Sequence, residues 1–124
     1  MNSNQLIYNL KNYLTNKINV LAQDNPAIAF IKPIVSRAIN NNVDKLKSSI
    51  DLLADSNGNI DVENIVSEMI ESVVNSNNFN INAPFLGTVE IGSGNIKLNI
   101  PFTNKVLVLN TNDLNEFKNI ILNN

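Results

Sequence analysis

The chain has 124 residues, of which 44% are hydrophobic, and this fits one globular domain spanning residues 1–124. It contains no histidine and no cysteine, which excludes serine–histidine and cysteine–histidine nucleophile pairs, nitrogen and sulfur ligands for zinc, and disulfide bonds. The net charge is −2 with a single arginine, so the clustered basic side chains typical of a nucleic-acid binder are not expected.

The composition is unusual in its abundance of asparagine (27 residues) and isoleucine (16 residues). Both residues have AT-rich codons, so we expect an AT-rich genome as the origin, such as a low-GC bacterium or a phage or mobile element living in one. The sequence has no run of 18 apolar residues, and its first residues lack the pattern of a secretory signal. We therefore expect no membrane segment, and a location in the cytoplasm or in an assembly made there.

The N-terminal region predicts two helices. Ser3 can cap the first, which begins near Asn4 and repeats apolar residues at steps of three and four. The second begins at Asn25-Pro26 and is apolar almost all round, so it should be buried on most sides. Pro33 should kink this second helix, which should end at residues 40–42. The repeating residues of the first helix are Ile7, Leu10, Leu14, Ile18 and Leu21.

Two further helices are predicted before residue 76. Asn42 can cap the third, and Asp61 can cap the fourth, which should end near Asn75. Ile60 lies just before the Asp61 cap and Ile65 four residues after it, and these two residues have the spacing of a hydrophobic staple. The apolar positions of the third helix are Val43, Leu46, Ile50 and Leu53.

From residue 79 the apolar periodicity changes to two, which predicts strands. Residues 79–82 alternate apolar and polar side chains, as in a short edge strand that Pro84 stops. Residues 87–102 predict a hairpin that turns at Ser93-Gly94, because this register matches the side chains on both faces. The predicted pairs are Ile91 with Ile96, Val89 with Leu98, Glu90 with Lys97, and Thr88 with Asn99.

A last strand is predicted at residues 106–109, after a turn near residues 103–104. Its alternation should place Leu107 and Leu109 on the apolar face of the sheet. Val106 and Val108 should then emerge on the opposite, more polar face.

The chain closes with a helix that Thr111 or Asn112 can cap. The predicted fold class is α+β, with an N-terminal four-helix region, residues 1–75, packed on a small antiparallel meander of three to four strands. The C-terminal helix completes the core, so residues 79–124 form the strand-plus-helix part of the same domain. The apolar side of that helix carries Leu114, Phe117 and Ile121.

The turn before the fourth helix, residues 55–61, resembles the middle of an EF-hand calcium loop, where oxygen ligands at alternate positions precede a glycine. Leu53 and Asn64 stand where that loop needs its first carboxylate and its bidentate acid. A tight structural turn is therefore favoured, with weak calcium or ligand binding as the alternative. No other cofactor is expected. The candidate calcium ligands are Asp55, Asn57, Asn59 and Asp61.

Acidic side chains gather around the fourth helix. Residues 51–75 carry six anions and no cation, whereas residues 1–50 carry six cations and two anions. Glu68 and Glu71 therefore have no cation one turn away, and this face suits a partner protein or the basic first half of the chain. Exposed apolar side chains of the outer sheet face, with Phe85 and Leu86, could extend it. The predicted interaction face is Asp61, Glu68, Glu71, Val106 and Val108.

No residue set for catalysis is apparent in the sequence. A carboxylate enzyme needs a cleft that separates the pKa values of its acids, and the sequence does not group Tyr8, Tyr13 and Arg37 into a pocket. We therefore expect a small non-catalytic structural or protein-interaction protein whose partner is another protein or a second copy of itself.

Overall fold

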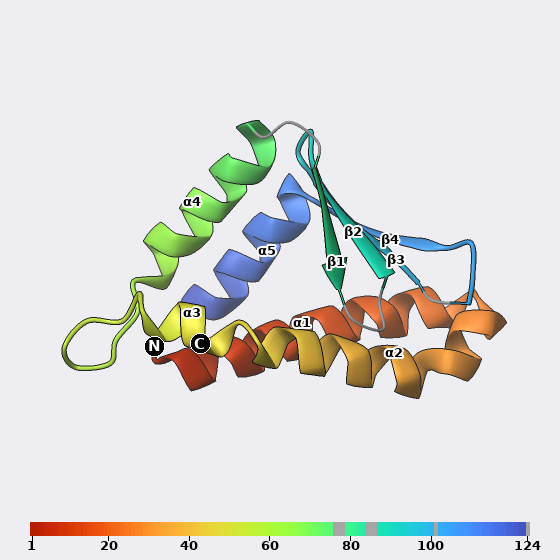
Figure 1. The fold of residues 1–124 in the computed structure, drawn as a ribbon, viewed down its shortest axis with the longest axis horizontal. Helices are drawn as coiled ribbons and strands as arrows, with labels where there is room; N and C mark the ends of the chain where they lie inside the picture. Colours follow the sequence, from red (N-terminus) through yellow and green to blue (C-terminus); the bar gives the residue numbers. More distant parts are fainter. Residues whose placement is uncertain (76–78, 84–86, 101, 124) are drawn as a thin grey trace.

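A computed structural model describes residues 1–75, 79–83, 87–100 and 102–123. It confirms the predicted α+β fold, with four helices, an antiparallel four-stranded sheet and a C-terminal helix in that order (Figure 1). The helices are α1 (Ser3–Gln23), α2 (Pro26–Asp44), α3 (Lys47–Asp51), α4 (Val62–Asn75) and α5 (Thr111–Leu122). The strands are β1 (Phe79–Ala83), β2 (Gly87–Gly92), β3 (Asn95–Asn99) and β4 (Val106–Asn110).

Helix α1 begins one residue earlier than a Ser3 cap would allow. The cap is Asn2, whose side chain accepts a hydrogen bond from the Gln5 backbone N–H at 2.9 Å. The Gln5 side chain accepts from the Asn2 N–H in return, at 2.9 Å, and this reciprocal pair decides which residue caps the helix. The predicted apolar stripe of α1 is confirmed: its five residues are buried or partly buried in the core.

Helix α2 runs beside α1, and the two form the long base of the molecule (Figure 1). The prediction that α2 is buried on most sides is wrong, because only one side packs on the core. Phe30 is 87% exposed and Ile34 is 55% exposed. The side that packs carries Ile28, Ile31, Val35, Ala38, Ile39 and Val43.

The predicted end of α2 and start of the third helix are also wrong. The helix continues through Pro33 and past residues 40–42 to Asp44, because a proline removes only one backbone donor while core packing holds the turns on both sides. Asn42 lies inside α2, and its side chain donates to the Ala38 carbonyl at 2.8 Å. Helix α3 is only five residues long. Ile50 is its one apolar residue and packs on the core, whereas Leu46 and Leu53 on either side of the helix are exposed.

The four strands form a meander in the order β1-β2-β3-β4, and each neighbouring pair is antiparallel. The predicted hairpin register is confirmed, including Glu90 opposite Lys97. Ser93 and Gly94 both have positive φ, 53° and 82°, as a two-residue type I′ turn requires. The predicted sides of β4 are confirmed too, because Leu107 is buried whereas Val108 is exposed.

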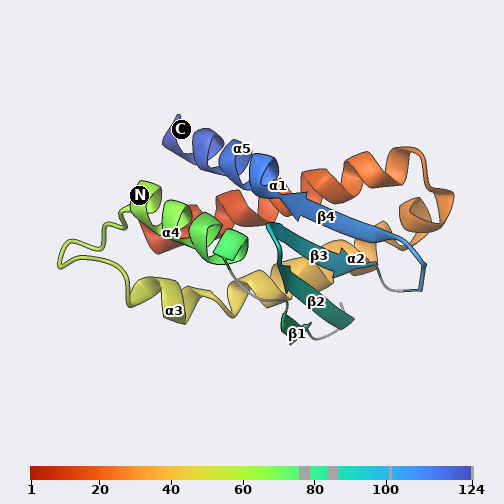
Figure 2. The same ribbon diagram turned by 90° about the horizontal axis from the view of Figure 1, so that it is seen from above.

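Helices α4 and α5 run side by side in opposite directions, and they lean away from the sheet (Figures 1 and 2). Asp61 caps α4 as predicted, accepting from the Asn64 N–H at 3.2 Å. The cap of α5 is Asn110, one residue before the predicted candidates Thr111 and Asn112. Its side chain accepts from the Asp113 N–H at 3.0 Å, and Asp113 closes the capping box.

Candidate functional site

An apolar cavity of about 330 Å³ lies between the helices and the inner face of the sheet. The α4–α5 pair diverges from the sheet, and both lie over the α1–α2 base (Figure 1). The lining residues of the cavity come from α1, α2, the segment after α2, α4, all four strands and α5. They are Leu10, Tyr13, Leu14, Ile39, Asn42, Val43, Leu46, Val66, Met69, Ile70, Ile81, Asn82, Val89, Ile96, Leu98, Leu107, Leu109, Leu114 and Phe117.

The mouth of the cavity is marked by three apolar lining side chains that water reaches. Leu46 is 46% exposed, Met69 is 54% exposed and Ile81 on β1 is 47% exposed. None of the lining residues carries a charge, and apart from Tyr13 the polar ones are the amides Asn42 and Asn82. The cavity is therefore an apolar site with neutral polar groups only.

The cavity opens to solvent at its mouth, but its apolar wall offers water few hydrogen bonds. An apolar occupant would remove that wall from water, which is favourable by about 25 cal/mol per Å² of apolar surface covered. The geometry thus favours an apolar occupant.

The cavity ends at a polar cluster that joins α1 to α5, which we call the α1–α5 junction. The rings of Tyr13 and Phe117 lie 5.2 Å apart at 46°, and the Tyr13 hydroxyl donates to the Asp113 carbonyl at 2.8 Å. Lys17 Nζ lies 5.2 Å over the Tyr13 ring and 3.0 Å from Asp113 Oδ1. It also approaches Glu116 Oε1 to 3.6 Å.

Three titratable groups of the α1–α5 junction, Tyr13, Lys17 and Asp113, have shifted pKa values. Burial raises the pKa of Tyr13, and the hydrogen bond to Asp113 raises the pKa of Lys17. Burial would raise the pKa of Asp113, but the Asn110 N–H and Lys17 together bring it below its ordinary value. Each shift moves the group further from neutral pH, which is the opposite of what a general acid or base needs. The junction is thus suited to holding α5 on α1.

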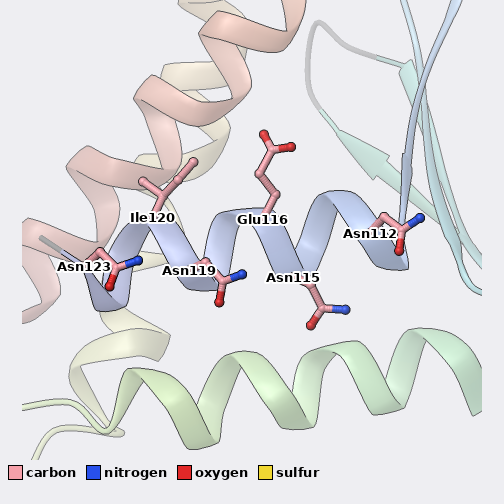
Figure 3. A pocket seen from close by; sticks show the side chains of 6 residues that line it. All are labelled: Asn112, Asn115, Glu116, Asn119, Ile120 and Asn123. Carbon is pink, nitrogen blue, oxygen red and sulfur yellow. The ribbon is translucent and has the colours of Figure 1, made fainter.

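A second hollow, of about 570 Å³, lies on the outside of α5. Figure 3 shows its six lining side chains, all of which come from α5. Because one helix supplies all of the lining among the described residues, the hollow is an open surface of α5. Its residues are Asn112, Asn115, Glu116, Asn119, Ile120 and Asn123.

The exposed side of α2 is a second unusual surface, which we call the outer α2 face. Phe30 and Ile34 lie one turn apart on it, and both are exposed although they lie on a helix whose other side is core. Pro33 and Arg37 are exposed beside them. A cluster of this kind on a small protein is a feature of interaction sites. The outer α2 face consists of Pro26, Phe30, Pro33, Ile34 and Arg37.

The predicted calcium turn is held together by its own hydrogen bonds. Asp55 Oδ1 accepts from the N–H groups of Asn57 and Asn59, at 2.8 and 3.0 Å, and Gly58 has φ of +80°. Asp61 is engaged in capping α4. Within residues 1–75, 79–83, 87–100 and 102–123, no three acidic side chains gather in a way that could hold a metal ion.

The residues of the predicted interaction face lie on two separate surfaces. Glu68 and Glu71 are exposed on α4, whose apolar side lines the cavity. Val106 and Val108 are exposed on β4, on the sheet face that points away from the cavity. Phe85 and Leu86 lie outside the described residues.

Of the three residues that the sequence did not group into a pocket, Tyr13 lines the cavity, whereas Tyr8 and Arg37 are exposed elsewhere.

Sequence reasoning missed two features, the outer α2 face and the cavity. The apolar pattern of the second helix is visible in the sequence, but it predicts that the rest of the chain buries this helix on most sides. The cavity left no such signal, because its lining residues have the same periodicity as ordinary core residues.

Comparisons with protein-family models, with curated proteins and with solved structures find no match to this chain. Among the described residues, no helix is both long and apolar enough to cross a membrane.

Proposed function

We propose that this protein is a non-catalytic protein-interaction module that associates with a second copy of itself through the outer α2 face. The observation that carries the proposal is Phe30, which is 87% exposed on a helix whose opposite side is core. Burying a phenylalanine side chain is worth about 1.5–3 kcal/mol. In a single chain Phe30 and Ile34 are exposed to water, and a second copy that covered them would be stabilised by burying them.

The outer α2 face is complementary to itself, which favours a second copy over another partner. In an antiparallel pair of α2 helices, the twofold axis would pass between Pro33 and Ile34. Phe30 lies three residues before Pro33 and Arg37 three residues after Ile34, so each Phe30 would meet Arg37 of the other copy. Guanidinium groups stack well on aromatic rings.

The charges on α2 agree with this pairing. Arg37 is the only charged residue of the outer α2 face, and the antiparallel arrangement places it against a ring and away from the Arg37 of the other copy. A contact between two helices buries less area than a standard stable interface. We therefore expect a weak dimer, with a dissociation constant of about 10 μM or higher.

The absence of catalysis in this proposal is supported by two observations. The sequence lacks histidine and cysteine. Tyr13, Lys17 and Asp113 beside the cavity have pKa values shifted away from neutrality, so these three groups are not poised for proton transfer at neutral pH.

The proposal is tested by sedimentation velocity at protein concentrations from about 5 μM to about 500 μM, a range that brackets the expected dissociation constant. The wild-type sedimentation coefficient should rise with concentration toward that of a dimer, and Phe30→Asp should remain a monomer throughout. Leu52→Asp is the matched control, because Leu52 is 85% exposed but lies far along the chain in the turn after α3. It should dimerise like the wild type.

The role of Arg37 gives a second measurement. Arg37→Ala should weaken dimerisation about thirtyfold, as expected for loss of two symmetry-related cation–π contacts worth about 1 kcal/mol each. A wild-type protein that stays monomeric at the highest concentration would overturn the proposal. So would a Phe30→Asp variant that dimerises as well as the wild type.

A further inference from the structure

We propose that the apolar cavity is a binding site for a small, neutral, apolar molecule with a body of about ten carbon atoms. The cavity observation is independent of the outer α2 face, because no residue of that face lines the cavity. The inference therefore goes beyond self-association, and either can fail without the other.

The size of the cavity sets the size of the ligand. An engineered apolar cavity of about 150 Å³ takes up benzene, and the cavity here is about 330 Å³. A molecule roughly twice the size of benzene would fill it. Small-molecule sites in proteins generally begin at about 300 Å³.

The chemistry of the lining sets the class of ligand. Core-facing aliphatic side chains from every strand of the sheet make up one wall, and Leu10, Leu14 and Phe117 lie among the residues of the helical walls. A charged group entering this space would lose its hydration without gaining a counterion, which proteins avoid. The ligand must therefore be neutral where it is enclosed.

The polar lining residues do not set the position of a polar end on the ligand. Tyr13 and Asn42 already donate to the carbonyls of Asp113 and Ala38, each at 2.8 Å. Asn82 is paired with Thr88, so its side chain lies on the opposite face of β1 from Ile81. A neutral hydroxyl end group suits this site, because it can lie in water at the mouth or enter behind the apolar body at a smaller cost than a charge.

The binding experiment uses 1-decanol as the probe and decanoate as its charged counterpart of equal chain length. Titration calorimetry with the full chain should show one molecule of 1-decanol bound per protein. Decanoate should bind about tenfold or more weakly, because its carboxylate must stay in water at the mouth and so fewer methylene groups reach the apolar walls. Affinity should stop rising for alcohols longer than about twelve carbons, once the cavity is full.

A matched pair of variants on the sheet locates the bound probe. Val89→Phe fills the cavity from its sheet wall and should lower the affinity for 1-decanol at least about tenfold. Val108→Phe makes the same change on the exposed face of β4 and should bind as the wild type does. Phe30→Asp should also bind normally, which separates this result from dimerisation.

A fluorescent reporter keeps the test decisive if Val89→Phe does not fold. The chain contains no tryptophan, and Met69 at the mouth is exposed enough to accept one. The emission of Met69→Trp should shift to shorter wavelength when 1-decanol is added, whereas Val108→Trp should not respond. The proposal is overturned if wild-type protein binds no 1-decanol, or if both tryptophan variants respond alike.

Discussion

Asp113 makes two kinds of contact at the start of α5. Its Oδ2 accepts from the Asn110 N–H at 3.0 Å and so closes the capping box, while its Oδ1 meets Lys17 Nζ at 3.0 Å. The first contact begins the helix, and the second fixes the helix to α1. A single carboxylate therefore links local structure to tertiary packing.

Asp113→Asn should lower the free energy of unfolding by about 1–2 kcal/mol at neutral pH, since it removes a charged hydrogen bond in a partly exposed place. The pKa of Asp113 is lower in the folded chain than in the unfolded chain. Its contribution is therefore complete above the unfolded pKa and is lost as the pH falls through the folded pKa. Urea unfolding between pH 2 and pH 7 should show that the variant loses less stability on acidification than the wild type.

Glu116→Gln is the control for this effect, because Glu116 lies further from Lys17 and is more exposed. It should change stability by less than about 0.5 kcal/mol. An equal loss for both variants would mean that Asp113 has no special role.

Gly58 gives a purely conformational prediction. Its φ is +80°, and a Cβ added there would meet nothing within 4 Å. Gly58→Ala should therefore cost about 1 kcal/mol through backbone strain alone, and Gly58→Asn should cost less because asparagine tolerates this conformation. Thermal unfolding of the two variants would contradict this explanation if alanine were the better tolerated.

The helix starts show how far residue-level prediction reaches. The sequence placed the starts of α1 and α5 within two residues, but it favoured Ser3 and Thr111 or Asn112 as caps. The true caps are Asn2 and Asn110. Runs such as Asn2-Ser3-Asn4 offer several side chains able to cap, and the choice depends on which one has a reciprocal partner three residues later. Gln5 and Asp113 are those reciprocal partners, and their positions in the sequence could have identified Asn2 and Asn110 as the caps.

At the scale of elements, the turn between α3 and α4 tests the calcium prediction. We expect millimolar calcium to leave the melting temperature unchanged, because Asp55 Oδ1 already accepts two backbone N–H groups. Asp55→Ala should lower the melting temperature equally with and without calcium. If calcium raised the melting temperature of the wild type by several degrees but not that of Asp55→Ala, the result would support calcium binding at this turn.

Helix α2 shows what periodicity leaves open at this scale. An apolar pattern all round a helix predicts that every side is covered, but it does not say which molecule covers each side. Here the chain covers the side of Ile28 and Val35 and leaves the side of Phe30 to solvent. In contrast, the hairpin of β2 and β3 was predicted correctly, because its register depends only on residues close in sequence.

At the scale of the whole molecule, the cavity was beyond sequence prediction for a geometric reason. The sequence assigned Val89, Ile96 and Leu107 to the apolar face of the sheet, and all three do face the interior. Whether that interior is filled depends on how far the α4–α5 pair diverges from the sheet. That distance is set by contacts throughout the molecule, and no local pattern encodes it.

The α1–α5 junction has a consequence for the order in which the chain folds. The α1–α2 hairpin and the sheet meander connect neighbouring segments, whereas Tyr13 and Asp113 are 100 residues apart. Closing so long a loop costs entropy before any contact repays it, so the junction should form after the transition state. Tyr13→Phe should then leave the folding rate nearly unchanged and speed unfolding about fivefold, for loss of a hydrogen bond worth about 1 kcal/mol. If the junction instead formed early, stopped-flow measurements on Tyr13→Phe would show slower folding. A junction that forms late sets the unfolding rate, and so the lifetime of the native state depends on this contact.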